Sequence, residues 1–320
     1  MADLEAAFAE HRRFLWSLSY RMTGSAADAD DVVQDTFVRA MQHPPQRTDV
    51  PLRPWLVKVA LNLSRDLLRK RKRRDYVGPW LPSPVETGRG FEPSRVNGDE
   101  TAPPSHEPAV DGGRTLEGRY DLLESVSFAF LLALERLTPG ERAVLLLRDV
   151  FDYSVKETAD ALDRSEASVK TTHHRARRAM TAYNGVRQPP TRARQAAAGA
   201  ALQQFLERLG AHDVAGIEAL LAADVRATTD GGGQFRSALR PIVGREKVMR
   251  FFLSIVDFTR DADVRVGRFN ASPGVVVDLR AMAKDRLAPR TVMTIDLDAN
   301  GRIVSIYVVS ATHKLTAIST

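Results

Sequence analysis

Residues 134–180 read LERLTPGERAVLLLRDVFDYSVKETADALDRSEASVKTTHHRARRAM and hold the starts of three consecutive helices. Thr138-Pro139-Gly140-Glu141 supplies a threonine cap, a proline in the first turn and an acid at the third helical position. Ser154 caps the second helix, with Glu157 three residues on, and Ser165 caps the third. This arrangement predicts a helix-turn-helix unit, which typically binds DNA.

The last helix of this stretch presents a polar and basic face. Val169, Ala176 and Met180 are expected to point inward. Short polar groups on the open side can approach base edges, while the arginines behind them hold phosphates. The residues predicted to contact DNA from this helix are Ser168, Lys170, Thr171, His174, Arg175 and Arg178.

The N-terminal part of the chain also has helical periodicity. A break at 23–25 precedes a helix expected from about Ala26 to Met41, and prolines at 44–54 then frame a constrained loop. The outer face of the first of these helices carries Asp30, Asp31, Gln34 and Asp35. A further helix is expected from Trp55, with Leu56, Val59, Ala60, Leu63 and Leu67 facing the core.

The end of that further helix is the sharpest electrostatic feature of the sequence. Residues 65–74 hold seven cations and one acid, Asp66. The run suits either the negative end of a helix dipole or a phosphate backbone, and both interpretations stay open. The net charge of +6 over the whole chain indicates an anionic partner only weakly.

Composition divides the chain into three units. Residues 76–116 hold seven of the 17 prolines and six glycines, which is typical of a linker. The Pro-Pro pair at 189–190 marks a second boundary, because consecutive prolines stop a helix. We therefore expect domains at 1–75, 117–188 and 191–320, joined by the linker.

The last unit mixes helices with strands. Residues 193–222 and 247–255 show helical spacing, and alternating runs follow at 263–269, 274–280, 291–297 and 302–309. Asp298-Ala299-Asn300-Gly301 predicts a hairpin between the last two runs. Helices followed by an antiparallel, concave sheet indicate an α+β fold.

Three stretches together resemble a known family. AADADDVVQDTFVRAMQ (26–42), PWLVKVALNLSRDLLRKRKRR (54–74) and residues 134–180 resemble regions 2 and 4 of bacterial extracytoplasmic-function sigma factors, in order and spacing. Three motifs that agree in order are far more specific than a lone helix-turn-helix. The resemblance implies a protein that binds core RNA polymerase and directs it to promoter DNA.

The resemblance also assigns roles to particular positions. Asp30, Asp31, Gln34 and Asp35 would bind the clamp helices of the polymerase β′ subunit, with region 4 meeting the β flap. The loop at 44–54 would accept a flipped base of the −10 element, and the helix from Ser165 would read the −35 element. The residues expected along the entering duplex are Asn62, Arg65, Arg69, Arg71, Arg73 and Arg74.

The third unit resembles the SnoaL-like, nuclear-transport-factor-like cone fold, whose fusion to these sigma regions is a known subgroup pattern. WLPEP-like, DGGGK-like and NPDKL-like motifs mark that subgroup, and here residues 80–84, 230–234 and 311–315 read WLPSP, DGGGQ and ATHKL. The third motif keeps only its Lys-Leu pair. The expected architecture is multidomain: two all-α sigma domains, a region 2 bundle and a region 4 helix-turn-helix, followed by an α+β cone domain.

In that subgroup the extra domain acts as a built-in regulator in place of a separate anti-sigma factor. A tryptophan on a proline-stiffened strip is suited to docking. Asp230 and its glycines would bring backbone close to that strip, bind an anion through N–H groups, or form a simple turn. The residues expected in an intramolecular regulatory contact are Trp80, Leu81, Pro82, Asp230, Gly231, Gly232, Gly233, Lys314 and Leu315.

Composition excludes several kinds of chemistry. The chain has no cysteine, which rules out disulfides, Cys-ligated zinc and thiol nucleophiles. The seven histidines are scattered, so we expect no metal, no cofactor and no catalytic residue. His212-Asp213 is the candidate for a cyclase-like pair, but a helix cap is favoured there. The alternative is a helix-turn-helix regulator with a ligand-sensing or vestigial cyclase-like C-terminal domain.

The sequence gives no sign of a membrane partner. Its N-terminus lacks a basic segment followed by an apolar core, and no stretch approaches 18 consecutive apolar residues. We therefore expect a cytoplasmic protein.

Overall fold

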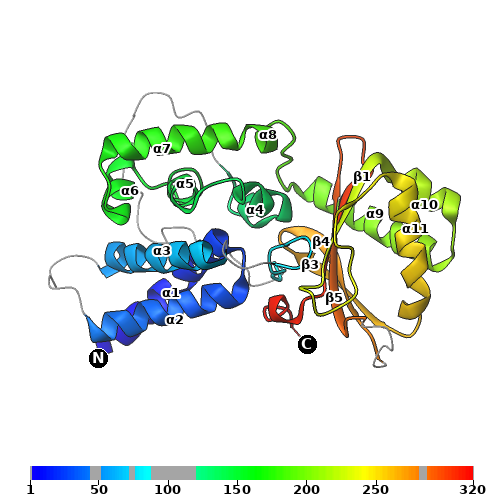
Figure 1. Ribbon diagram of the computed structural model, residues 1–320, viewed down its shortest axis with the longest axis horizontal. Coiled ribbons are helices and arrows are strands. Elements are labelled where there is room, and N and C mark those ends of the chain that lie inside the picture. Colours follow the sequence, from blue (N-terminus) through cyan, green and yellow to red (C-terminus); the bar gives the residue numbers. More distant parts are fainter. Residues whose placement is uncertain (1, 44–51, 72–75, 88–119, 281–286, 320) are drawn as a thin grey trace.

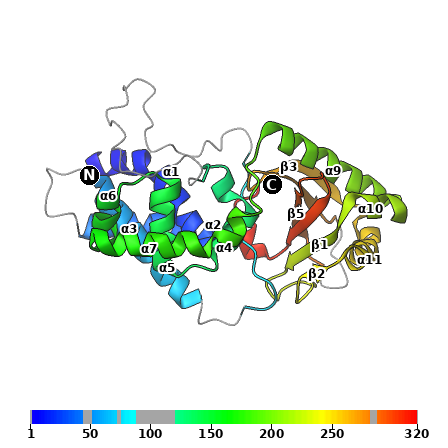
Figure 2. The ribbon, with the colours of Figure 1, turned by 90° about the horizontal axis from the view of Figure 1, so that it is seen from above.

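The computed structural model describes residues 2–43, 52–71, 76–87, 120–280 and 287–319, with side chains in the first helix from Phe8 onward. A helical half and a sheet half lie side by side, and the C-terminal segment sits at their seam (Figures 1 and 2). Most of the expected loop at 44–54, as well as Arg73 and Arg74, lies outside the described residues.

The N-terminal part forms three packed helices, α1 (Ala2–Thr23), α2 (Ala26–Gln42) and α3 (Leu52–Arg71). The Ser25 side chain caps α2 by accepting from the Asp28 amide. The third helix begins at Leu52 rather than at Trp55, and its expected inner stripe is only partly right. Leu56 and Ala60 are buried, and so are Val57, Leu61, Ser64 and Leu68 in place of Val59, Leu63 and Leu67.

A second set of helices follows the linker. The capping boxes expected at Thr138 with Glu141 and at Ser154 with Glu157 are both present, and Ser165 caps the last long helix. The elements are η2 (Glu124–Val126), α4 (Phe128–Leu134), α5 (Pro139–Leu145), the π-helical turn η3 (Leu146–Val150), α6 (Val155–Leu162), α7 (Glu166–Ala179) and α8 (Thr181–Asn184).

The two helical sets share one hydrophobic core. The rings of Phe14 in α1 and Phe151 after η3 meet edge to face at 5.2 Å between centroids. Helix α3 lies between α1 and α2 on one side and α5 and α6 on the other. This double packing explains why α3 buries more of its circumference than a single apolar stripe predicts.

The C-terminal half is a six-stranded sheet with helices on one face, in the strand order β2-β1-β6-β5-β4-β3. Asp298 N bonds to Arg302 O in the expected hairpin. The elements are α9 (Arg192–Gly210), α10 (Val214–Leu220), β1 (Leu221–Asp230), β2 (Ile242–Val243), α11 (Arg245–Val256), η4 (Asp257–Thr259), β3 (Asp263–Phe269), β4 (Ser272–Asp278), β5 (Arg290–Leu297), β6 (Ile303–Val309) and η5 (Thr312–Lys314).

Strand β1 corrects the expected topology. It occupies residues assigned to the end of a helix and to a loop, and it pairs with β6 in parallel, so the sheet is mixed rather than antiparallel. Ala223 and Asp224 are both exposed, which interrupts the alternation that would reveal a strand. Because β1 runs parallel to β6, its last residue, Asp230, lies beside the C-terminal end of β6.

The two faces of the sheet have different partners. One face packs against α9, α10 and α11 through a core that includes Phe205, Ile295 and Ile306. The other face meets the linker and α4, where Leu81 is buried and the rings of Phe128 and Tyr307 stack at 5.2 Å. This second face therefore connects the sheet to the helical half.

Candidate functional site: the junction of three domains

A buried carboxylate lies at the centre of the contact between the linker and the C-terminal domain. Asp230, 1% exposed, ends β1 with its side chain facing the linker. Its carboxylate accepts hydrogen bonds from the Leu81 amide at 2.7 Å, the Tyr76 hydroxyl at 2.6 Å and the Gly232 amide at 3.0 Å. The ammonium group of Lys314 lies 2.6 Å from the same carboxylate.

Lys314 closes the network from the C-terminal segment. Its Nζ also donates to the Leu81 carbonyl at 2.6 Å and lies 4.6 Å from the ring centroids of both Tyr76 and Trp80. Burial lowers the pKa of Lys314 to about 8, against the opposing effect of Asp230. Burial and the bond to Asp230 raise the pKa of the Tyr76 hydroxyl, which therefore stays a donor.

The glycines after Asp230 allow the close approach. Gly232 has φ +58°, and a Cβ there would lie 2.9 Å from the Cβ of Ala311. The side chain of Gln234 accepts a bond from the Thr312 amide. Gly231 is buried and Gly233 is exposed beside Val77. The structure thus brings together all the residues of the expected regulatory contact, with Pro82 and Leu315 also buried.

Trp80 joins this network to the N-terminal helices. The tip of its indole ring packs on Gly24, where a Cβ would be 2.5 Å away, and the guanidinium of Arg71 lies 4.2 Å from the ring centroid. Arg71 also pairs with Glu135 at 2.8 Å and donates to the Thr23 carbonyl. Arg71, expected along the DNA duplex, is therefore held inside the junction in this arrangement.

Sequence reasoning missed a second junction, at the tip of the β3–β4 hairpin. The side-chain amide of Asn270, a fully buried residue, donates to Tyr20 Oη at 2.6 Å and to the Val126 carbonyl at 2.8 Å. Its Oδ1 accepts from the Val85 amide at 2.9 Å. One side chain thus touches both helical sets and the linker. The Asn at a two-residue turn was a readable hairpin signal, but the distant partners were not.

The expected DNA-facing side chains of α7 lie mostly on its open surface. Lys170, Thr171, His174, Arg175 and Arg178 are exposed, and Ser168 is half-buried. The neighbouring His173 points the other way, with Nε2 2.9 Å from a carboxylate oxygen of Asp149. The α7 helix thus keeps its cations and short polar groups on one accessible side.

The remaining predicted residues lie on two further surfaces. Asp30, Asp31, Gln34 and Asp35 form an exposed acidic face on α2. On α3, Asn62 is exposed, Arg65 is half-buried, and Arg69 pairs with Asp66 at 2.8 Å.

The candidate pair of the C-terminal domain, His212 and Asp213, has structural partners, and His212 Nε2 lies 3.5 Å from a carboxylate oxygen of Asp257. Asp213 caps α10 by accepting from the Gly216 amide, and Asp278 pairs with Arg290 at 2.6 Å. Among the described residues, no group of three or more His, Asp or Glu side chains is arranged to hold a metal ion. Within the same residues, no helix is long and apolar enough to cross a membrane.

Three segments of the chain match known protein families. Residues 7–74 match Sigma-70 region 2, residues 127–180 match Sigma-70 region 4, and residues 202–314 match a SnoaL-like domain. These matches define a sigma factor of the sigma-70 class with an appended domain.

Individual related proteins narrow the class of sigma factor further. The chain is 33% identical over 248 residues to the ECF RNA polymerase sigma factor SigJ of Mycobacterium tuberculosis, covering 77% of this chain and 70% of that protein. It is 37% identical over 177 residues to SigG of the same species, covering 55% of this chain and 47% of SigG. The crystal structure of SigJ superposes with a TM-score of 0.71 at 26% identity and covers 98% of each chain.

The chain belongs to the extracytoplasmic-function RNA polymerase sigma factors. It binds RNA polymerase and initiates transcription at promoters, which makes it a transcription regulator.

Proposed function

We propose that the C-terminal domain restrains this sigma factor by fastening region 2, the linker and region 4 into one closed arrangement. The observation that carries the proposal is the buried network of Asp230, Leu81 and Lys314. Removing one partner of a buried charge pair typically lowers stability by about 3–5 kcal/mol, so this network holds the linker firmly against the C-terminal domain.

Promoter geometry supports a restraint. The −10 and −35 elements are separated by roughly 25 base pairs, or about 85 Å of duplex at 3.4 Å per base pair. Helix α3, with 20 residues, is about 30 Å long at 1.5 Å per residue. Regions 2 and 4 share one core along that helix, so binding both elements at once requires them to separate.

Charges at the closed interface support the same reading. Lys58 of α3 pairs with Asp163 after α6 at 2.7 Å, and Arg71 pairs with Glu135 after α4. Each bridge joins a basic residue of the region that would meet duplex DNA to an acid of region 4. Opening the arrangement would free these cations for phosphates.

Two surfaces remain open in the closed arrangement and are proposed as initial contacts. The acidic face of α2, at Asp30, Asp31, Gln34 and Asp35, would meet the β′ clamp helices of core polymerase. The exposed side of α7 would meet the −35 element, since its cations are accessible. In this proposal the polymerase and the upstream element are engaged first, and region 2 reaches the −10 element after opening.

The test uses the full chain with Asp230→Asn and, separately, Lys314→Met, each mixed with core polymerase on a promoter fragment. We expect both variants to bind the promoter more tightly than the wild type, because the buried network of Asp230, Leu81 and Lys314 is weakened. The matched control is Arg260→Ala, which breaks an exposed ion pair with Asp257 in the same domain. Thermal melts verify that the variants are folded. Folded variants with unchanged or weaker promoter binding would overturn the restraint, and unchanged core binding would leave the sigma assignment intact.

A further inference from the structure

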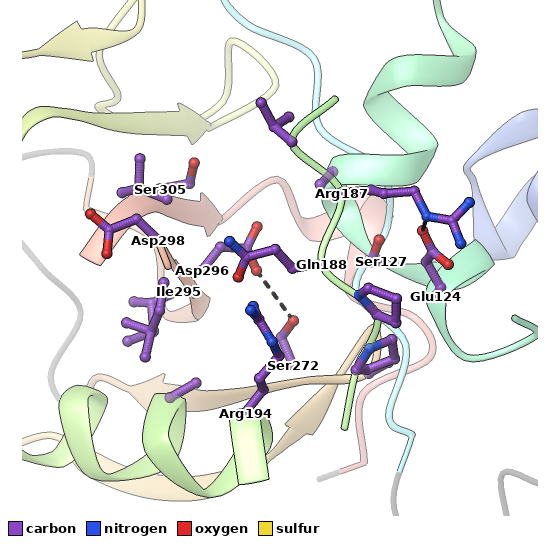
Figure 3. Close-up of a pocket in the computed structure, with 18 of the residues that line it drawn as sticks. Glu124, Ser127, Arg187, Gln188, Arg194, Ser272, Ile295, Asp296, Asp298 and Ser305 are labelled. Carbon is purple, nitrogen blue, oxygen red and sulfur yellow. Dashed lines mark hydrogen bonds and ion pairs between the residues drawn. The ribbon is translucent and has the colours of Figure 1, made fainter. Parts of the chain in front are cut away.

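A cavity of about 1060 Å³ lies between region 4 and the C-terminal domain (Figure 3). Its walls come from α4, α8, the chain at 186–190, the start of α9 and the strands β1, β4, β5 and β6. This volume suits a drug-sized organic molecule, since ligand sites typically span about 300–1,000 Å³.

The floor of the cavity is a polar row across four strands. Arg226 of β1 pairs in register with Ser305 of β6, and Ser305 with Asp296 of β5. Ser272 of β4 donates to Asp296 at 3.5 Å, as Figure 3 shows. This row lies on the same face as Tyr307, which packs on α4, and not on the face that packs against α9, α10 and α11. The floor therefore belongs to the interdomain face of the sheet.

The opposite wall is apolar. Helix α4 contributes Ala129, Leu132 and Ala133, α8 contributes Ala182, and Pro189-Pro190 closes one side. Small side chains leave room there, and the charged groups on this side are Arg136, just after α4, and the paired Glu124 and Arg187. An occupant would place an apolar body against this wall.

Three arginines at the cavity have no carboxylate partner among the described residues. They are Arg136, Arg194 and Arg226, all exposed to the cavity or its mouth. By contrast, Arg187 in the same lining lies 3.4 Å from Glu124. Asp298, one of the acids in the lining, already accepts hydrogen bonds from the backbone amides of Asn300 and Arg302. Guanidinium groups without partners beside an apolar wall recognise an acidic group on an apolar molecule.

We propose that this cavity binds a small amphipathic organic anion, with its acidic group on Arg226 and its apolar body on the alanine and proline wall. The occupant touches region 4, the connecting chain and the sheet at once. A ligand that binds only when these surfaces are together stabilises the closed arrangement by mass action. Such a ligand is an effector of the sigma factor rather than a substrate.

The experiment is calorimetric titration of the full chain with 8-anilinonaphthalene-1-sulfonate, an amphipathic anion, and with N-phenyl-1-naphthylamine, its uncharged counterpart. We expect one site that prefers the sulfonate. Arg226→Ala should weaken sulfonate binding about tenfold, the loss expected for one charge-assisted hydrogen bond, and leave the amine within about twofold. Ala182→Trp, which fills the cavity from an exposed position, should weaken both probes.

Arg240→Ala, an exposed arginine outside the cavity lining, is the matched control and should change neither titration. Sulfonate binding that survives both Arg226→Ala and Ala182→Trp would place the probe elsewhere on the surface and overturn the proposal, as would absence of binding. Equal affinity for the two probes would overturn the anionic class. The readout is binding to the isolated chain, so its failure leaves the proposed restraint by Asp230 and Lys314 untouched.

Discussion

The side-chain amide of Asn270 donates a 2.6 Å hydrogen bond to the hydroxyl of Tyr20, although 250 residues separate them. The Tyr20 hydroxyl in turn donates to the Ser83 carbonyl at 2.7 Å. Both side chains are fully buried, so neither bond competes with water. A hairpin tip of the C-terminal domain is thereby built into the interior of region 2.

Asn270→Ala should lower the free energy of unfolding by about 3 kcal/mol or more, because it leaves several buried polar groups without partners. The φ of +53° at this position adds strain for alanine. Denaturant titration followed by tryptophan fluorescence measures the loss. Asn300→Ala, an exposed hairpin residue, should stay within about 0.5 kcal/mol of the wild type. Similar losses for the two variants would show that the junction adds nothing to stability.

Joining α3 covalently to region 4 should prevent the protein from binding both promoter elements at once and should therefore weaken promoter binding strongly. The chain contains no cysteine, so Lys58→Cys with Asp163→Cys creates the only two thiols, at positions bridged at 2.7 Å in the wild type. A short bismaleimide should link them and hold the regions together, whereas N-ethylmaleimide caps them singly. Electrophoretic mobility shifts with core polymerase measure the difference. Full promoter binding by the linked protein would contradict the need for opening.

Removing one of the α7 cations proposed to contact DNA phosphates should weaken DNA binding in a salt-dependent way. For Arg178→Ala, the slope of log affinity against log salt should become less negative by about 0.9, the value for one lost phosphate contact. Fluorescence anisotropy of a labelled promoter duplex at several salt concentrations gives the slope. Arg240→Ala in the C-terminal domain serves as control. Identical slopes for the wild type and Arg178→Ala would remove this residue from the DNA interface.

Asp296 makes stability depend on pH in a specific window. Burial raises its pKa from 3.8 to about 6, against hydrogen bonds from Tyr307 and Ser272. The folded state therefore favours the neutral carboxyl, and this contribution is complete below about pH 4 and lost as the pH rises through 6. The pKa difference between the folded and unfolded states corresponds to about 3 kcal/mol of stability, which partial solvent exposure of the side chain reduces to about 1–2 kcal/mol.

Asp296→Asn imitates the neutral carboxyl at every pH. The variant should be about 1–2 kcal/mol more stable than the wild type at pH 7 and nearly equal to it at pH 4. Denaturant titrations at the two pH values measure this, with the exposed Asp224→Asn as control. A stability difference that does not change with pH would show that Asp296 ionises normally in the folded protein.

The helical half was predictable because its signals are local. Capping boxes at Ser154 and Thr138 set helix starts within a few residues, and the structure has both. The predicted stripe on α3 was only partly right, because burial there depends on two sets of helices, one of them more than 60 residues away in sequence. A periodicity argument assumes a single buried face, and Leu61 and Leu68 lie outside that face.

The sheet half was harder to predict, because its features depend on residues that are distant in sequence. Strand β1 has no clear alternation of apolar and polar residues, so its sequence does not reveal a strand. Its position inside the sheet depends on parallel pairing with β6, about 80 residues later. Lys314 was found only through a motif resemblance, because nothing local distinguishes a buried lysine from an exposed one. Asn270 lies at a two-residue turn, which is a local feature, but its bonds to Tyr20 and Val126 depend on how three domains meet.

The core shared by regions 2 and 4 has a thermal consequence. Parting the two helical sets would expose apolar surface around Phe14 and Phe151, and such exposure carries a positive heat-capacity change. The free energy of opening is then curved in temperature, and apolar packing holds the closed form less firmly as the protein is cooled. The packing that joins these helices would therefore make promoter access respond to cold as well as to charge.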